Sequence, residues 1–223
     1  MSPLPVQFTD RWRDHLERPS YQDAVCWHLL LGDSATVRAV AAQARQRLAR
    51  FSGLHMTPER WLHVTVLLAG PAAAITHGDM DAMLGLAQAA LSRTAPVTVT
   101  LGRVLYHPEG IALSVSPADV LTPVLEAAQA ATRGVTGMSG TTGTPGAAWT
   151  PHMSLCYSVS EQPAAPVIAE LGKSLPACEV TIDRLSLVVQ HGPEQLWDWR
   201  IAGSARMPGT LRCTCAYQAW RPR

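Results

Sequence analysis

The sequence contains a single lysine, Lys173, among its 18 basic residues, and its formal net charge at pH 7 is only +1. A protein that binds long duplex nucleic acid through its phosphates needs a strongly basic face. This composition does not supply one. Any polyanion that the protein binds must therefore be recognised locally, at one small site.

Apolar runs long enough to cross a bilayer are also missing from the sequence. A membrane-spanning helix needs roughly 18 or more apolar residues in succession. The first twenty residues carry Asp10, Arg11, Arg13 and Asp14 where a secretory signal would be apolar. We therefore expect a cytoplasmic protein with no membrane partner.

The cysteines are few and scattered, at positions 26, 156, 178, 213 and 215. An odd number without regular pairing suits reduced thiols better than a disulfide framework. Only Cys213 and Cys215 lie close together, and one intervening residue does not match the spacing of zinc ligands. We predict free thiols, no metal site and no cofactor.

The rest of the composition is that of a globular chain. Of 223 residues, 47% are hydrophobic and 16% are charged, which is enough apolar surface for a sizeable core. The length exceeds one typical domain and falls short of two. We expect one large domain or one domain built from two similar lobes.

Two parts of the chain repeat one order of elements. The first unit has an apolar strand at 24–31, a helix capped by Asp33 or Ser34 and ended by Gly53, and a strand at 61–68. The second unit has a strand at 111–115, a helix opened by Ser116-Pro117 and a strand at 152–157. The other predicted elements are helices at 79–92 and 163–173 and strands at 96–101, 178–189 and 196–201. We therefore predict an α+β fold made of two β-α-β units.

The domain boundaries follow from these units. We expect an N-terminal extension at 1–21, a bilobal domain at 22–202 with lobes from about 22–95 and 96–202, and an irregular tail at 203–223. Glycine at every third position predicts a flexible loop at 134–150. Two interpretations of this loop stay open, a mobile lid or an unused surface insertion.

Two predicted strands are interrupted by polar, titratable side chains in the same way. His63 and Thr65 alternate with apolar residues in the first unit, and His152 and Ser154 do so in the second. Because side chains alternate across a strand, each strand presents an imidazole and a hydroxyl on one face. Composition alone gives roughly one His-x-Ser/Thr triplet by chance, so one motif would be weak support.

The chain contains a third such triplet, His55-Met56-Thr57, directly before Pro58. Proline has no backbone N–H to donate inside a strand, so we predict a connector there and discount the triplet. His63 and His152 differ from it because they occupy equivalent places in the two units.

If the two units pack as pseudo-symmetric lobes, both imidazoles and both hydroxyls can surround one small anion. Near neutral pH one imidazole can accept a proton while the other donates one, as cleavage of a phosphodiester requires. Thr65 and Ser154 would donate hydrogen bonds to the non-bridging oxygens, where charge builds in the transition state. This chemistry needs no metal.

These motifs resemble the 2H phosphoesterase superfamily. WHLLLGD (27–33), ERWLHVTVLLAG (59–70), WTPHMSLCYS (149–158) and DRLSLVV (183–189) are most similar to bacterial members of the 2′-5′ RNA ligase family. The resemblance covers about residues 22–201. It implies a bilobal α+β fold with antiparallel sheets around a central cleft, and 2′,3′-cyclic phosphodiesterase activity on RNA ends or nucleotides, in some members with reversible 2′-5′ ligation.

Three further residues are candidates for substrate binding. His28 interrupts the first strand on the face opposite Trp27, and Trp149 and Tyr157 flank the second motif. Aromatic rings can stack on a base, although large aromatics in sheets more often pack in the core. For His28 the alternative is a structural hydrogen bond.

We expect a monomeric, metal-independent phosphoesterase in which His152 activates water and His63 protonates the leaving oxygen. The near-symmetry of the motifs makes that assignment reversible. Two alternatives stay open, a protein that binds phosphate-terminated RNA ends or nucleotides without turnover, and a metal hydrolase that uses the same histidines.

Overall fold

The computed structural model describes residues 4–13, 23–142 and 148–208. The strands are β1 (Gln7–Phe8), β2 (Ala24–Leu30), β3 (Leu54–Met56), β4 (His63–Pro71), β5 (Val97–His107), β6 (Gly110–Ser116), β7 (His152–Ser158), β8 (Gln162–Pro163), β9 (Ser174–Ile182), β10 (Arg184–Gln190) and β11 (Trp199–Arg206). The helices are α1 (Ala35–Leu48), α2 (His77–Leu91), α3 (Thr122–Thr136) and α4 (Ala164–Leu171).

One large antiparallel sheet organises the fold. Its strands pair in the order β11-β10-β2-β4-β7-β6-β5-β9, and β3 adds to β7. Strands β4 and β7, which carry the two motifs, are the central pair, and two half-sheets meet at their junction. The predicted α+β fold with antiparallel sheets in two similar lobes is therefore confirmed.

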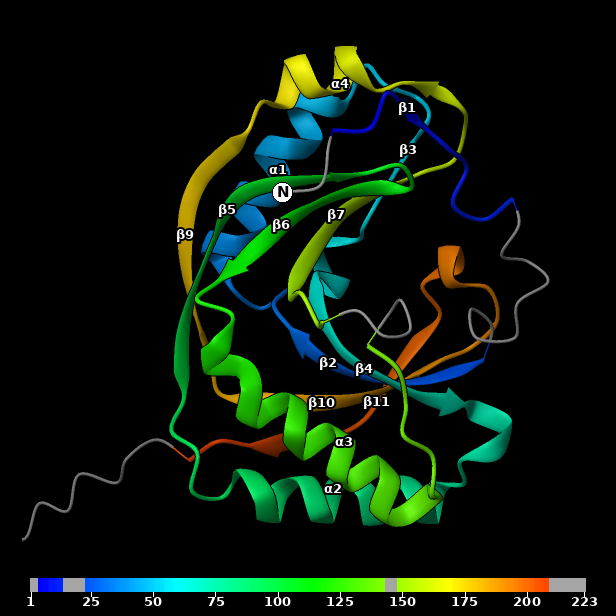
Figure 1. Ribbon diagram of the computed structural model, residues 1–223, viewed down its shortest axis with the longest axis vertical. Coiled ribbons are helices and arrows are strands. Elements are labelled where there is room, and N and C mark those ends of the chain that lie inside the picture. Colours follow the sequence, from blue (N-terminus) through cyan, green and yellow to red (C-terminus); the bar gives the residue numbers. More distant parts are fainter. Residues whose placement is uncertain (1–3, 14–22, 143–147, 209–223) are drawn as a thin grey trace, which may run out of the picture.

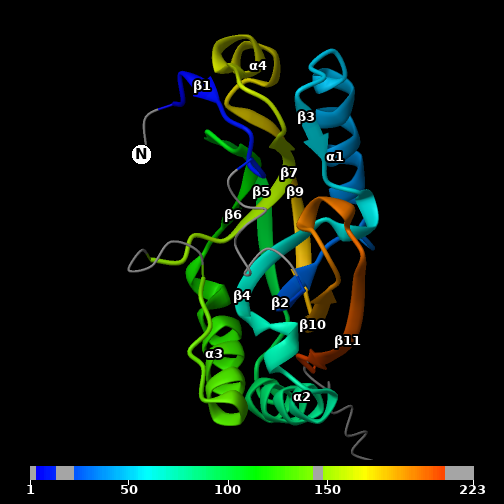
Figure 2. The same cartoon turned by 90° about the vertical axis from the view of Figure 1, so that its right-hand side faces the viewer.

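The two lobes do not correspond to the two halves of the sequence, so the predicted division into 22–95 and 96–202 is wrong. Strands β10 and β11 come late in the chain but pair beside β2. Helix α1 packs against β9 and α4, and α3 packs against β4 and α2. Figures 1 and 2 show α2 beside α3 at one end of the molecule and α1 beside α4 at the other. Periodicity shows which face of a helix is apolar, but not which sheet that face will cover.

The first predicted unit needs two corrections. Helix α1 begins after its cap Ser34, as expected, but ends at Leu48 rather than at Gly53. The segment predicted as a connector contains strand β3, which pairs with β7. Pro58 lies just beyond this short strand, and the amide of Thr57 still donates to the carbonyl of Leu155 at 3.0 Å. Proline therefore ends the pairing without preventing it.

Further corrections concern the last strands. The single strand predicted at 178–189 is two strands, because the chain leaves one half-sheet at Asp183 and enters the other. Strand β11 continues to Arg206, which pairs with Arg184, so the irregular tail does not begin at 203. Residues 209–223 lie outside the described residues.

The N-terminal residues 4–13, predicted as an extension, are part of the packed structure. Strand β1 pairs with β8, and Phe8 is fully buried in the main core. The second helix also starts later than predicted, since a 3₁₀ turn at 119–121 separates Ser116-Pro117 from α3.

The glycine-rich segment predicted as a loop at 134–150 begins inside helix α3, which ends at Thr136, and is then held on strand β4 at Thr141. Thr141 and Leu68 exchange two backbone hydrogen bonds, of 2.8 and 2.9 Å. Gly140 has a φ of +63°, and a Cβ there would lie 2.8 Å from the carbonyl oxygen of Leu68. Only glycine fits this close, left-handed position. The lid interpretation therefore does not apply to this stretch, and residues 143–147 lie outside the described residues.

One buried hydrogen bond ties α3 to the sheet across the two halves of the chain. The indole Nε1 of Trp27 on β2 donates to Oγ1 of Thr132 at 3.0 Å, and both side chains are fully buried. Within the described residues, none of the helices has the length and apolar character to cross a membrane.

Replacing Thr132 with valine keeps the shape of the side chain and removes the acceptor. A buried indole N–H left without a partner should lower the free energy of unfolding by about 1–3 kcal/mol. The same change at exposed Thr122, in the same helix, should alter it by less than about 0.5 kcal/mol. Urea unfolding measures both, and equal losses in the two variants would contradict this role of the bond.

Candidate active site

The junction of β4 and β7 brings the two histidine motifs together. Val64 pairs with Met153 across the junction, and both side chains are buried. Residues that pair across antiparallel strands point to the same side, so their neighbours point to the opposite side. That opposite face therefore carries all four motif residues, which are His63, Thr65, His152 and Ser154.

Each imidazole is held by the same backbone contact. Nδ1 of His63 lies 2.6 Å from the carbonyl oxygen of Trp61, and Nδ1 of His152 lies 2.8 Å from that of Thr150. A carbonyl can only accept, so Nδ1 carries the proton and donates it. In both rings Nε2 is then the atom available to a ligand or a transferable proton.

The two histidines differ in burial. His63 is only 5% exposed, whereas His152 is exposed. Burial lowers the pKa of His63 from the ordinary 6.5 to about 4; the Trp61 hydrogen bond and the charge of Glu194 oppose the shift, and His152 adds to it. The neutral form of His63 therefore dominates at neutral pH.

His28 is packed against His63. The two ring centroids are 4.3 Å apart, and the other side of His28 stacks on Trp199 at 5.1 Å. Burial, followed by the charge of His63, lowers the pKa of His28 well below its ordinary value, while a backbone hydrogen bond at Val64 opposes the shift. At 3% exposure His28 packs beside the His63 ring. Its contact with a substrate stays a prediction.

Tyr157 reaches the site through a bulge in β7. Leu155 is an extra residue opposite the Ile111–Ala112 step of β6, which turns Tyr157 to the same face as Ser154. Burial mainly raises the pKa of Tyr157, to about 12, with Glu194 adding to the shift and Arg11 and Ser154 opposing it.

Trp149 makes a backbone contact with strand β4, and its stacking on a base stays a prediction. Its indole Nε1 donates to the carbonyl oxygen of Thr65 at 3.1 Å, and the half-buried ring packs against the main core. It thus attaches the segment before β7 to strand β4.

An aromatic cluster beside His63 was not predicted from the sequence. Trp61, Trp197 and Trp199 form a small buried cluster with Val188, separate from the main core. The centroid of Trp199 is 5.0 Å from that of His63, and the centroid of Trp197 is 6.4 Å away. Two tryptophans separated by one residue were the available signal, but nothing in the sequence places them near β4.

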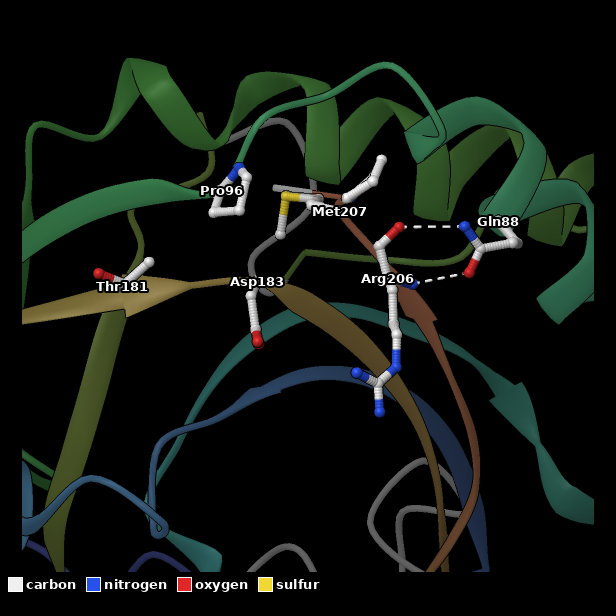
Figure 3. A pocket seen from close by; sticks show the side chains of 7 residues that line it. Gln88, Pro96, Thr181, Asp183, Arg206 and Met207 are labelled. Atoms are coloured by element: carbon white, nitrogen blue, oxygen red, sulfur yellow. Dashed lines mark hydrogen bonds between the residues drawn. The ribbon is translucent and has the colours of Figure 1, made fainter. Parts of the chain in front are cut away.

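Two surface hollows of the described residues lie away from the motif residues. The larger, of about 500 Å³, is lined by residues such as Gln88, Pro96 and Asp183 and is shown in Figure 3. There the Gln88 amide is hydrogen bonded to the backbone of Arg206, at 2.8 and 3.0 Å. The smaller, of about 330 Å³, includes Trp12 and His55. Neither is lined by His63 or His152.

The described part of the chain contains no group of three or more His, Cys, Asp or Glu side chains that could bind a metal ion. Cys26, Cys156 and Cys178, which are described, are free thiols, as predicted.

The lowered pKa of His63 makes stability depend on pH. Between about pH 6.5 and 4 the unfolded chain binds a proton at His63 that the folded protein excludes, so stability is lost as the pH falls through this window. We expect His63→Gln to remove about 2–3 kcal/mol of the loss between pH 7 and 4, judged by about 1.4 kcal/mol per pKa unit. His28 should contribute in the same direction. Urea unfolding at several pH values measures the difference. A wild-type His63 resonance that titrates near pH 6.5 would contradict it.

The sequence and the fold were compared with known proteins. A comparison with curated protein sequences found no match. Among solved structures, TT0787 of Thermus thermophilus superposes with a TM-score of 0.66 at 18% identity, covering 84% of this chain and 99% of that one. Escherichia coli LigT in complex with ATP superposes with a TM-score of 0.61 at 13% identity, covering 83% and 98%. Residues 34–194, well over half of the sequence, match the sequence model of a protein family, the 2′-5′ RNA ligase superfamily. The chain therefore belongs to this superfamily, that of the 2H phosphoesterases.

Proposed function

We propose that the protein is a metal-independent phosphoesterase that opens 2′,3′-cyclic phosphates on RNA ends or nucleotides. One observation carries the proposal: two imidazoles at one strand junction make the same Nδ1 contact to a carbonyl two residues earlier. Each ring thereby offers Nε2 on the face that also carries the hydroxyls of Thr65 and Ser154. General acid and base catalysis at one phosphate requires two such imidazoles.

In the reaction, a neutral imidazole takes a proton from water as the water oxygen attacks phosphorus. The bond from phosphorus to the 3′ oxygen breaks, and the second imidazole, protonated at the start, gives its proton to that oxygen. The product is a 2′-phosphate. Thr65 and Ser154 donate to the non-bridging oxygens while charge builds there.

Burial favours the reverse of the roles expected from the sequence. His63, whose pKa is about 4, is neutral at pH 7 and ready to accept a proton. His152 is exposed to solvent. We assign the base to His63 and the acid to His152.

The substrate class rests on charge and on the fold. A net charge of +1 suits a nucleotide or a short RNA end better than a long duplex. LigT, which shares this fold, has been crystallised with 3′-AMP, ATP and NADP⁺. A second candidate function, binding of phosphate-terminated RNA ends or nucleotides without turnover, is favoured by the 5% exposure of His63.

Purified protein should hydrolyse 2′,3′-cyclic nucleotides in the presence of EDTA. Replacing either His63 or His152 with alanine should lower kcat/KM by about 10²- to 10⁴-fold, the usual contribution of a general acid or base. His77→Ala, on α2, is the matched control and should keep wild-type activity. Binding that survives in an inactive wild type would favour the non-catalytic alternative, and activity lost with EDTA would favour a metal hydrolase.

The assignment of acid and base can be tested with a leaving group that needs no proton. Thymidine 3′-(p-nitrophenyl phosphate) releases a stable anion, so loss of the acid should matter little. We expect His152→Ala to stay within about tenfold of wild type on this substrate, and His63→Ala to lose about 10²- to 10⁴-fold in rate. The release of p-nitrophenolate measures both rates. A large loss in His152→Ala with little loss in His63→Ala would instead make His152 the base and His63 the acid.

A further inference from the structure

The burial of His63 is at odds with a role in which its Nε2 meets a substrate. His28 lies on one side of the His63 ring, and residues 193–199, which we call the cover, contribute further contacts; the cover includes the 3₁₀ turn η5 (Glu194–Leu196) and the first residue of β11. Trp197 and Trp199 of the cover are both buried and lie against the His63 ring. His152, which should act on the same phosphate, has no comparable cover among the described residues and is exposed.

The cover is attached to the N-terminal segment through one carboxylate. Arg11 donates from Nε to Oε2 of Glu194 at 2.9 Å and from Nη2 to Oε1 at 3.2 Å. Trp12 adds its indole N–H to Oε2 at 3.0 Å. Glu194 therefore receives three hydrogen bonds from two successive residues, two of them in the paired geometry that a guanidinium and a carboxylate favour.

The N-terminal segment is itself fixed to the other half-sheet. The amide of Arg11 donates to the carbonyl of Ser158 at 2.9 Å, and that of Thr9 to Pro108 at 2.8 Å. Nη1 of Arg11 also donates to Glu109, in the turn between β5 and β6, at 3.1 Å. The contact between Arg11 and Glu194 thus joins the two lobes: the N-terminal segment is fixed to one, and the cover belongs to the other.

The cover packs apart from the main core. Its tryptophans belong to the small separate cluster, with Trp61 and Val188. In the closed arrangement Nε1 of Trp61, Nε1 of Trp199 and Oε1 of Gln195 are buried without a partner among the described residues. Buried polar atoms left unpaired destabilise a structure, and exposure to water would satisfy them.

The backbone conformation of Trp197 also indicates that specific contacts hold the cover in place. Its φ of 54° is left-handed, a conformation that a bulky residue adopts only where its surroundings hold it. The indole of Trp197 donates to Nε2 of His55 at 3.0 Å. The closed cover is therefore held by a few specific contacts.

We propose that Arg11 is a latch that holds the cover closed over His63, and that release of Glu194 exposes this imidazole. The claim that opening admits a substrate rests on the proposed function. The latch itself does not, since it concerns only access to His63.

Access can be measured without substrate, by the reaction of diethyl pyrocarbonate with each imidazole in the full chain, followed by mass spectrometry of peptides. His152 is the internal reference, because its ring has the same Nδ1 contact and is exposed. In the wild type we expect His63 to react at least about tenfold more slowly than His152. Loss of a charge-assisted pair should raise the rate at His63 about tenfold in Arg11→Ala and Glu194→Gln, and by less in Arg11→Lys.

Arg13→Ala is the matched control. Arg13 lies in the same segment but pairs on the surface with Glu161 rather than with Glu194, so its loss should leave the rate at His63 unchanged. An unchanged rate in folded Arg11→Ala and Glu194→Gln, or an equal rise in Arg13→Ala, would overturn the latch. If Arg11→Ala does not fold, the nearly isosteric Glu194→Gln decides.

Exposure of His63 on release of Glu194, in a protein without hydrolytic activity, would refute the proposed function and leave the latch standing. Hydrolytic activity together with an unchanged modification rate at His63 in the variants would support the proposed function and refute the latch.

Discussion

The pairing of Val64 with Met153 is the contact on which the site depends. It joins two half-sheets that otherwise extend in opposite directions, and it commits both of these side chains to the core. The alternation of a strand then sends the neighbouring histidines and hydroxyls to the opposite face. A shift of one residue in either strand would bury an imidazole in place of an apolar side chain, so the core that stabilises the fold also sets the register of the site.

The two halves of the sheet are similar, but their motif histidines differ in exposure to solvent. Equivalent carbonyl contacts orient the two imidazoles, but the tryptophan cluster covers His63 and leaves His152 exposed, and His28 is buried with His63. Two similar motifs therefore place their imidazoles in different surroundings. We propose that this difference separates the base from the acid, and that the N-terminal segment controls when the base is exposed.

Local patterns in the sequence were sufficient for the part of the site that lies on strands. Apolar alternation placed His63 and Thr65 on one face, and the repeated β-α-β order matched His152 to His63. What the sequence could not show depends on long-range packing: the crossing at Asp183 between the half-sheets, the bulge at Leu155 that turns Tyr157, and the contact between Arg11 and Glu194. The last of these joins residues 183 positions apart, and neither segment alone contains a signal for the other.

A crystal structure of the protein with a nucleoside 2′-monophosphate, the product of the proposed reaction, would decide whether both imidazoles reach one phosphate. We predict that Nε2 of His63 and Nε2 of His152 both lie within hydrogen-bond distance of that phosphate group, with Thr65 and Ser154 on its remaining oxygens. A phosphate bound elsewhere, or one that contacts His152 while His63 stays out of reach, would contradict this mechanism.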